Sequence, residues 1–456
     1  MTEPNQIGGV SATRIDAMRA REAGIFAAAR PKTRDALENG SAAFLDGVPM
    51  LWMKDWPQPF PILVSDASGA HLTDVDGHVI DDFCLGDTGS MFGHSPAPVA
   101  AALMAQATKG LTYMLPTKDA LEVGRLLQKR FGPFLWQIAT TATDANRFSI
   151  RIARAVTGRA KILVFEGCYH GAVDDAMVRD VGGHTVNRPG LVGQVADLSA
   201  TSKVVEFNDL PALEAALAEG DIAAVLAEPV MTNCCMVLPD PGYHDALRAL
   251  TRKYGALLIL DETHTISSGL GGYTKTHGLD PDMFVLGKCV AGGLPAAVWG
   301  MSENVAKRYR AVDAARAPGF SGIGTTLSAN PLQFAAMRAN LAEVMTAENY
   351  AHMEKGAARL ERGLADAIRR HKAPWHVARV GARVEFICQP QPLRNGSDSY
   401  TAHKPALEAA IHAALVNRGC LIAPFHNMML VSPATSLEQI DRLIAAFDAI
   451  TAELFA

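Results

Sequence analysis

The sequence predicts an α/β protein: a large domain with a central, mostly parallel sheet covered by helices, and a smaller α+β domain. Between about His94 and Asn340, short runs rich in Val, Ile and Leu ("KILVF", "IAAVLAEP", "GALLILDE" and "DMFVLGK") alternate with helical stretches such as "PGYHDALRALTRKYG". Continuous apolar strands separated by helices are typical of a parallel sheet that is buried on both faces. A chain of 456 residues is also too long for one simple core, which favours more than one domain.

Changes of pattern along the chain divide it into three segments. Residues 1–93 mix a helical start with short strands, and "GAHLTDVDGHVIDDF" predicts a hairpin around the turn pair Asp76-Gly77. Residues 94–340 form the large domain. In residues 341–456, amphipathic helices flank the strand-like "RVGARVEFIC", which predicts the small α+β domain. We expect the N-terminal segment to contribute to this small domain and to a dimer interface.

The composition is that of an ordinary soluble globular protein, with 49% hydrophobic and 20% charged residues. A net charge of −5 gives no reason to expect nucleic acid or an anionic membrane as a partner. No apolar run reaches the ~18 residues that a membrane-spanning helix requires, and the first twenty residues lack the apolar core of a signal peptide. Seven cysteines without a dense framework favour reduced thiols, so we expect a cytoplasmic protein.

Three of the apolar runs each end in an ionisable residue: "AAVLA" leads to Glu228, "LLIL" to Asp261 and "MFVLG" to Lys288. Open parallel sheets bind ligands at the carboxyl ends of their strands. A single charged residue there is as readily explained by the chain reaching solvent. Two acids and a lysine at the same edge favour a reaction centre.

A second sequence pattern indicates an anion-binding site at the start of a helix. "TTATDANRFSIRIARAVTG" predicts a helix, because apolar residues recur along it at four-residue intervals. The small residues Thr141-Ala142-Thr143 lie in its first turn, where unpaired N–H groups and the helix dipole favour an anion, although ordinary capping by threonine is the alternative. The Gly-rich motifs of dinucleotide and nucleotide-triphosphate sites are missing from the sequence, which favours another phosphate-bearing cofactor.

The motifs "ATTATDA", "FEGCYHG", "AEPV", "ILDETHT", "LGKCVAGGLP" and "GTTLSANP" occur in one order along the chain. In that order and approximate spacing they resemble class III pyridoxal-phosphate-dependent aminotransferases, and most of all the glutamate-1-semialdehyde aminomutase-like branch. The resemblance is clear from about Ala70 to Asn330. It implies a fold type I PLP-dependent transferase with pyridoxal 5'-phosphate as cofactor. We expect an aminotransferase that moves an amino group between a small amine or amino acid and a keto acid; the alternative is an aminomutase, racemase or amine lyase that acts through the same carbanion.

The resemblance also implies roles for individual residues. Lys288 would form the Schiff base with the cofactor and move the substrate proton, and Asp261 would pair with the protonated pyridine nitrogen. Tyr169 would stack on the ring. Thr326 would contact the cofactor of the neighbouring subunit, which implies a homodimer. The other cofactor-binding residues implied by the match are Thr141, Ala142, Thr143, His170, Glu228 and Thr263.

The sequence departs from the family pattern at several places. The usual phosphate-binding turn Ser-Gly-Thr is Thr-Ala-Thr here, which keeps the backbone donors, although Ala tolerates a positive φ less well than Gly. Thr263 stands where the family has a valine behind the ring, so its hydroxyl could bond a ring oxygen or its methyl could face the ring. The role of the following His264 stays open.

Three residues are candidate substrate contacts. Trp52 would line an apolar pocket, with plain packing as the alternative. Asp87 stands where relatives have larger apolar residues, so it would favour a hydroxylated or cationic substrate, unless it only caps a turn. Arg383 would clamp a carboxylate, with an ion pair to Glu385 as the alternative.

A function of a different class must be weighed against this one. Asp261, Glu262 and His264 bring three metal-ligand types within four positions, as a metal-dependent hydrolase would require. Neighbouring strand residues point to opposite faces, however, and His-Glu-x-x-His spacing does not occur there, so we expect no metal. A non-catalytic binding module is disfavoured because Lys288 and Asp261 are both present.

Overall fold

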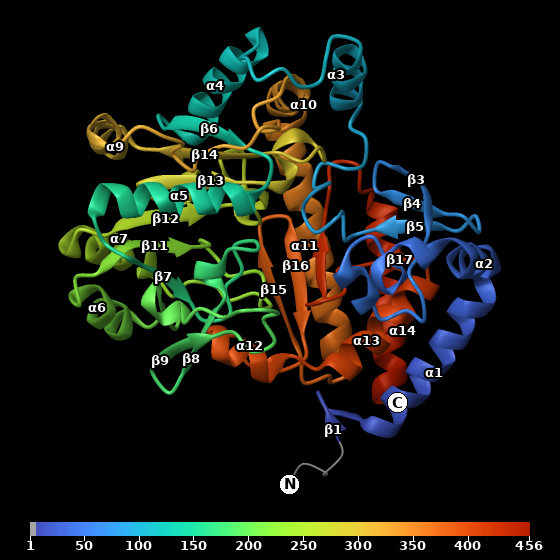
Figure 1. Cartoon of the computed structure of the whole chain (residues 1–456). Coiled ribbons are helices and arrows are strands. Elements are labelled where there is room, and N and C mark those ends of the chain that lie inside the picture. The colour runs from blue at the N-terminus through green and yellow to red at the C-terminus, as the bar shows by residue number, and fades with distance from the viewer. Residues whose placement is uncertain (1–5) are drawn as a thin grey trace.

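Residues 6–456 are described by the computed structural model (Figure 1). Their centre is a seven-stranded sheet with the order β10-β7-β11-β12-β13-β14-β6, in which every strand but β14 runs in the same direction. All side chains of β11 and β12 are buried, which explains their continuous apolar sequences. The predicted α/β architecture is therefore confirmed. The strands are β6 (Leu135–Ala139), β7 (Lys161–Phe165), β10 (Ser202–Val205), β11 (Ile222–Ala227), β12 (Leu257–Asp261), β13 (Met283–Leu286) and β14 (Ala297–Met301).

Helices pack on this sheet and around it. The helix α5 contacts β6 and β11 to β14, while α7 packs against β12 and beside α6. Another helix, α10, lies between α3 and α4 (Figure 1). The bounds are α3 (Ala97–Ala107), α4 (Lys118–Phe131), α5 (Ala142–Thr157), α6 (Leu210–Ala218), α7 (Tyr243–Tyr254), α8 (Gly272–Thr276), α9 (Glu303–Ala315) and α10 (Pro331–Ala339). A hairpin of β8 (Val178–Val181) and β9 (His184–Asn187) projects from this part.

The two ends of the chain meet in a second part of the molecule. A four-stranded sheet has the order β17-β5-β4-β3, so the C-terminal β17 pairs with the N-terminal β5. The predicted hairpin is present, with β4 and β5 antiparallel around Asp76 and Gly77. A three-stranded antiparallel sheet, β15-β16-β18, lies beside the long helix α11. The division into residues 1–93, 94–340 and 341–456 stays a prediction.

Helices of the two terminal segments pack together: α1 lies along α13, and α11 lies along α14. The strands of this part are β1 (Gln6–Ile7), β2 (Val10–Ser11), β3 (Val64–Ser68), β4 (His71–Asp74), β5 (Val79–Asp82), β15 (His376–Val380), β16 (Arg383–Ile387), β17 (Cys420–Leu421) and β18 (Met428–Leu430). Its helices are α1 (Ala12–Ala29), α2 (Pro31–Gly40), α11 (Ala347–Arg370), α12 (Gly396–Ala402), α13 (Pro405–Asn417) and α14 (Leu437–Phe455).

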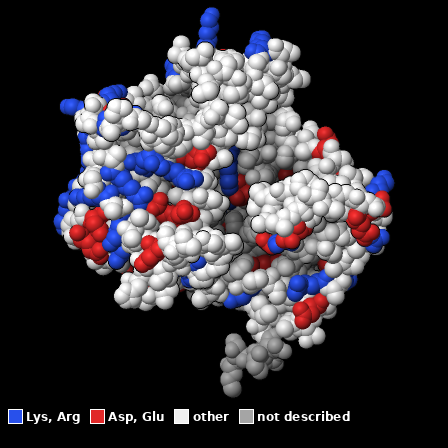
Figure 2. Space-filling model, in the orientation of Figure 1, with Lys and Arg blue, Asp and Glu red and all other residues white. Residues whose placement is uncertain are grey.

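Figure 2 shows a hollow between the part that carries the large sheet and the part built from the chain ends, with charged side chains of both signs at its edges. Among residues 6–456, no helix combines the length and the apolar character that a membrane crossing requires. The carboxyl ends of β11, β12 and β13 carry the candidate site described next.

Candidate active site

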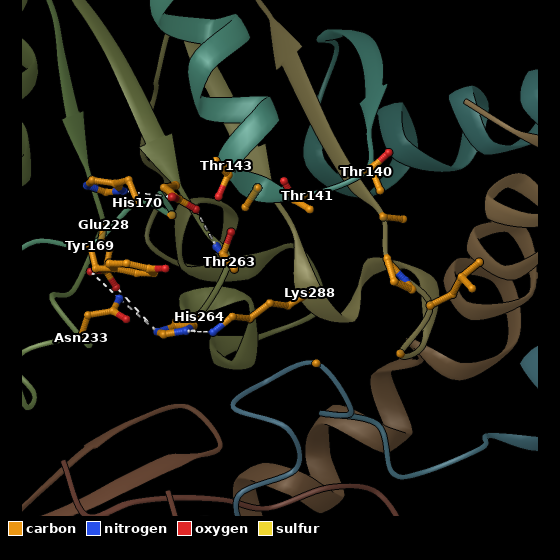
Figure 3. A pocket seen from close by; sticks show the side chains of 18 residues that line it. Thr140, Thr141, Thr143, Tyr169, His170, Glu228, Asn233, Thr263, His264 and Lys288 are labelled. Carbon is orange, nitrogen blue, oxygen red and sulfur yellow. Dashed lines mark hydrogen bonds and ion pairs between the residues drawn. The ribbon is translucent and has the colours of Figure 1, made fainter. Parts of the chain in front are cut away.

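Three strand ends bring ionisable side chains to one cavity (Figure 3). Asp261 is the last residue of β12, Glu228 follows β11, and Lys288 begins a short 3-10 turn just after β13. The cavity holds about 300 Å³. The sequence prediction that these three residues share a sheet edge agrees with this geometry. Of the residues implied by the motif match, those that line the cavity are Thr141, Ala142, Thr143, Tyr169, His170, Glu228, Asp261, Thr263 and Lys288.

The N-terminus of α5 forms one wall of the cavity. Thr141 caps the helix by accepting a hydrogen bond from the backbone N–H of Asp144 (3.2 Å), and the helix begins at Ala142. Gly287 approaches so closely that a Cβ atom there would lie 2.7 Å from the Cβ of Ala142. Capping and anion binding are therefore compatible: the threonine satisfies one N–H group, and others of the first turn remain available to a phosphate.

A second close approach shapes the same wall. Gly171 has a φ of 83°, and a Cβ atom there would lie 2.2 Å from Thr143 Oγ1. The neighbouring backbone N–H of Ala172 donates to the same oxygen (3.1 Å). Glycine is therefore required at this position by both its conformation and its surroundings.

Asp261 is held as a charged carboxylate. Its Oδ2 accepts hydrogen bonds from Asn146 Nδ2 (2.8 Å) and His170 Nδ1 (3.0 Å), and its Oδ1 accepts one from the backbone N–H of Thr263 (3.1 Å). Burial alone would raise the pKa of Asp261, but these donors and the charge of His170 lower it to about 2. Burial alone would likewise lower the pKa of His170, but Asp261 and Cys168 raise it to about 10.

Lys288 lies apart from His170 in Figure 3 and has a left-handed backbone, with a φ of 50°. Its Nζ lies 2.6 Å from Asp87 Oδ2 and 2.5 Å from His264 Nε2. Burial alone would raise the pKa of Asp87, but the positive charge of Lys288, followed by interactions with His264 and Arg383, holds it well below its usual range. Burial, together with the positive charges of Lys288 and Arg383, lowers the pKa of His264 to about 3, so its imidazole is neutral at pH 7.

The remaining cofactor candidates lie at the mouth of the cavity or outside it. Tyr169 is 45% exposed (Figure 3), which leaves its ring free to stack on a bound group. Thr326 is exposed and does not line the cavity of its own chain. The small-residue stretch around it is joined to the site by a 3.2 Å hydrogen bond between Ser328 Oγ and Thr140 Oγ1. The roles assigned to these residues stay predictions.

The three substrate candidates lie outside the lining of this cavity. Arg383 is fully buried, its guanidinium donates to Thr88 Oγ1, and its Nε and NH1 have no hydrogen-bond partner. Its NH1 lies 3.8 Å from Asp87 Oδ1. The alternative partner Glu385 pairs instead with His426 (2.8 Å). Trp52 is 41% exposed and helps to line a neighbouring, largely apolar cavity.

The "DETH" cluster does not converge on one point. Asp261 faces the cavity, whereas the carboxylate of Glu262 is buried and accepts from Thr265 Oγ1 (2.6 Å) and from the backbone N–H of Tyr273 (3.0 Å). His264 turns to Lys288. In residues 6–456 no group of three or more His, Cys, Asp or Glu side chains is placed to hold a metal ion.

Sequence reasoning missed two groups of polar residues at the site. Asn146 contacts Asp261 and lies four residues after Ala142, on the same face of α5, so helical periodicity was a signal that could have found it. Thr232 and Asn233 contact His264 from the irregular loop after β11 (2.7 and 3.4 Å to Nδ1). Their positions depend on the course of that loop, which no periodic pattern reveals.

The fold and this site define a pyridoxal-phosphate-dependent enzyme of fold type I. The chain belongs to the class III aminotransferase family, whose profile, described as "Aminotransferase class-III", matches residues 52–451.

Curated and solved relatives narrow the family further. Glutamate-1-semialdehyde 2,1-aminomutase from Methylacidiphilum infernorum is 33% identical over 393 residues, covering 84% of this chain and 89% of that protein. A solved glutamate-1-semialdehyde aminomutase from Pseudomonas aeruginosa PAO1 is 47% identical with a TM-score of 0.95, covering 98% of this chain and 100% of the other. A variant of that protein was solved in complex with PMP, with 47% identity, the same coverage and a TM-score of 0.96.

The residues of the cavity fit a pyridoxal phosphate. Asp261 Oδ1 accepts only one backbone N–H, so it retains a lone pair for a ring N–H. The first turn of α5 supplies N–H donors for a phosphate, and Gly171 keeps that wall open. Lys288 supplies the amine. A charged carboxylate, an anion site and an amine thus face one space of suitable size.

Proposed function

We propose that the protein is a pyridoxal-phosphate-dependent aminomutase, which moves an amino group between two carbons of one substrate. The observation that carries this proposal is the 47% identity, over 98% of the chain, to a solved glutamate-1-semialdehyde aminomutase. Transamination between an amine and a keto acid, which the sequence led us to expect, is the second candidate. Both reactions use the same cofactor and lysine, so the difference lies in whether the amino group leaves with a second molecule.

The protein's own groups have separate tasks in this reaction. The bound cofactor supplies an electron sink for the carbon that loses its proton. Asp261 holds the proton on the ring nitrogen, because its carboxylate stays charged. The first turn of α5 would bind the phosphate and so orient the cofactor. Lys288 Nζ holds the cofactor in the resting enzyme, and it accepts and returns the substrate proton during turnover.

The substrate class follows from the groups around Lys288. Asp87 Oδ2 lies 2.6 Å from Lys288 Nζ, so a second amino or hydroxyl group on the substrate would meet this carboxylate. The positive charge of the buried Arg383, whose NH1 lies 3.8 Å from Asp87 Oδ1, would favour a substrate carboxylate on the same side of the site. The proposed substrate is therefore a small amino acid with a second polar group beside the reacting carbon, as glutamate-1-semialdehyde has.

The working unit in this proposal is a homodimer. Large apolar side chains are exposed on α3, on α4, on the loop between them and on the segment before α10, and α10 packs against α3 and α4. An exposed apolar surface of this kind is typical of a protein–protein interface. A partner covering it would also bring a second copy of Thr326 into the assembly, as the resemblance implies. The exposed apolar residues of this region are Met104, Leu111, Tyr113, Met114, Leu115, Leu121, Phe320 and Leu327.

A direct test separates the two candidate reactions. The holoenzyme is incubated with glutamate-1-semialdehyde alone, and the isomer with the amino group and carbonyl exchanged is measured. An aminomutase forms it without an acceptor, whereas an aminotransferase requires a keto acid such as pyruvate and forms alanine from it. Strict dependence on pyruvate would refute the proposal. Lys288→Ala serves as the inactive control for both outcomes.

A further inference from the structure

Behind Lys288 lies a chain of hydrogen bonds that the proposed reaction has not used. His264 Nε2 is 2.5 Å from Lys288 Nζ, and His264 Nδ1 is 2.7 Å from Thr232 Oγ1. Thr232 Oγ1 in turn donates to Glu228 Oε2 (2.5 Å). The chain is shielded from solvent, since Thr232 is fully buried and His264 and Glu228 are almost so.

The chemistry of these groups fixes the direction of each bond. A carboxylate only accepts, so the hydroxyl proton of Thr232 points to Glu228. The lone pairs of Thr232 Oγ1 then face His264, and His264 Nδ1 must carry the ring proton. Because the imidazole is neutral, His264 Nε2 is left as a bare acceptor aimed at Lys288 Nζ.

We propose that His264, Thr232 and Glu228 form a proton relay that converts the Lys288 ammonium to the free amine before it reacts. One proton passes from Lys288 Nζ to His264 Nε2, the Nδ1 proton moves to Thr232 Oγ1, and the hydroxyl proton moves to Glu228. The ammonium and carboxylate thus become an amine and a carboxylic acid. Only bonds to hydrogen change, and the total charge of the four groups is constant.

The surroundings of Glu228 suit it as the final acceptor. Burial raises the pKa of its carboxyl group above the usual value, although the charge of His170 and hydrogen bonds from Thr232 and Asn233 act in the other direction. Asn233 Nδ2 donates to Glu228 Oε1 (3.1 Å), which holds the carboxylate in place for Thr232. Asp87, the other partner of Lys288, has the opposite tendency: its strongly lowered pKa suits it as a counter-ion and makes it a poorer final proton acceptor than Glu228.

Thr232 provides the cleanest test, because it is fully buried and does not line the cavity. This inference rests on the proposed role of Lys288. Full-length protein freed of cofactor is mixed with pyridoxal phosphate, and samples are quenched with borohydride over time. Mass spectrometry then quantifies the cofactor that reduction has attached covalently to the peptide containing Lys288. Affinity for pyridoxamine phosphate, which cannot react with the lysine, reports separately on the integrity of the site.

We expect Thr232→Val to slow fixation by about tenfold or more, since a positioned acid–base partner contributes at least that much. Thr232→Ser keeps the hydroxyl and should fix the cofactor within about twofold of the wild-type rate. Both variants should bind pyridoxamine phosphate as the wild type does. A purely structural role of Thr232 would instead weaken that binding in Thr232→Val.

The outcomes separate this inference from the proposed function. If the cofactor still becomes covalently attached in the active site of Lys288→Ala, the proposed role of Lys288 is wrong. If Lys288→Ala fixes none while Thr232→Val reacts at the wild-type rate, only the relay is wrong. Should Thr232→Val not fold, His264→Phe fills the ring volume without nitrogens and must show the same slowing; an unchanged rate would overturn the relay.

Discussion

Replacing Asp261 with Asn should lower the free energy of unfolding of the cofactor-free protein by about 2 kcal/mol at pH 7. The pKa of Asp261 is lowered from 3.8 to about 2, and at 1.36 kcal/mol for each pH unit this difference corresponds to about 2.4 kcal/mol. The raised pKa of His170 expresses the same contact, so the two values are not added. Cys168 also contributes to the raised pKa of His170, so the pKa shift of Asp261 is the better measure of the interaction between Asp261 and His170.

The pH dependence of stability gives this prediction a sharper form. The folded protein holds the His170 proton up to about pH 10, whereas the unfolded chain releases it near pH 6.5. The stabilisation is therefore complete below pH 6.5 and is lost as pH rises through 10. The Asp261 contribution has the opposite sense: it is present above pH 3.8 and is lost as pH falls through about 2.

Urea unfolding of wild type and Asp261→Asn between pH 6.5 and 10 measures both effects. The wild type should lose stability over this range, and the variant should lose markedly less, because without the carboxylate burial makes His170 neutral throughout. All other titrating groups are common to the two proteins, so the difference isolates the pair. Equal stability at pH 7, or parallel losses up to pH 10, would refute the reasoning.

Two further predictions concern the wall of the cavity and the assembly. Gly171→Ala would place a Cβ atom 2.2 Å from Thr143 Oγ1, so it should weaken pyridoxamine phosphate binding by about tenfold. It should also lower the free energy of unfolding by ~1–3 kcal/mol more than a control substitution does. That control is Gly182→Ala, which has a similar positive φ and open space around it; equal effects of the two changes would contradict the steric argument. Leu121→Glu, at a side chain 77% exposed on α4, should shift a dimer to monomers in sedimentation, while Val192→Glu at a comparably exposed position should not. A Leu121→Glu protein that sediments as a stable dimer would place the interface elsewhere.

Much of the fold could be predicted because its signals are local. The strands of the large sheet are buried on both faces, so their sequences are continuous apolar runs that are visible without any structure. The position of Asp261 and Lys288 at one sheet edge follows from the same reasoning, since parallel strands end at the same side. The α5 wall was also predictable, because Thr141 and the following small residues mark a helix start.

What could not be predicted depends on irregular loops. Asp87 lies 201 residues before Lys288 in the sequence, and the contact between them exists only because two distant loops meet. Thr232 is similar: nothing in its neighbourhood predicts that its hydroxyl lies between His264 and Glu228. The site residues found from strand and helix patterns are therefore those placed by strands and by α5. The loop residues Tyr169, His170 and Thr326 came only from the family resemblance, and most of the residues that were missed lie in loops.

The loop that carries Asp87 has a strained backbone. Leu85, Asp87 and Thr88 all have positive φ values, a conformation that side chains other than glycine adopt at some cost, and Lys288 has one too. The loop is held in this shape by Asp82, whose Oδ1 accepts from the backbone N–H of Leu85 (2.9 Å). Backbone strain of this kind persists where the surrounding structure enforces it, and here it lies on both chain segments that bring the carboxylate and the amine together. From the strained backbone and the close ion pair, we expect the position of Asp87 beside Lys288 to serve the proposed reaction more than it serves stability.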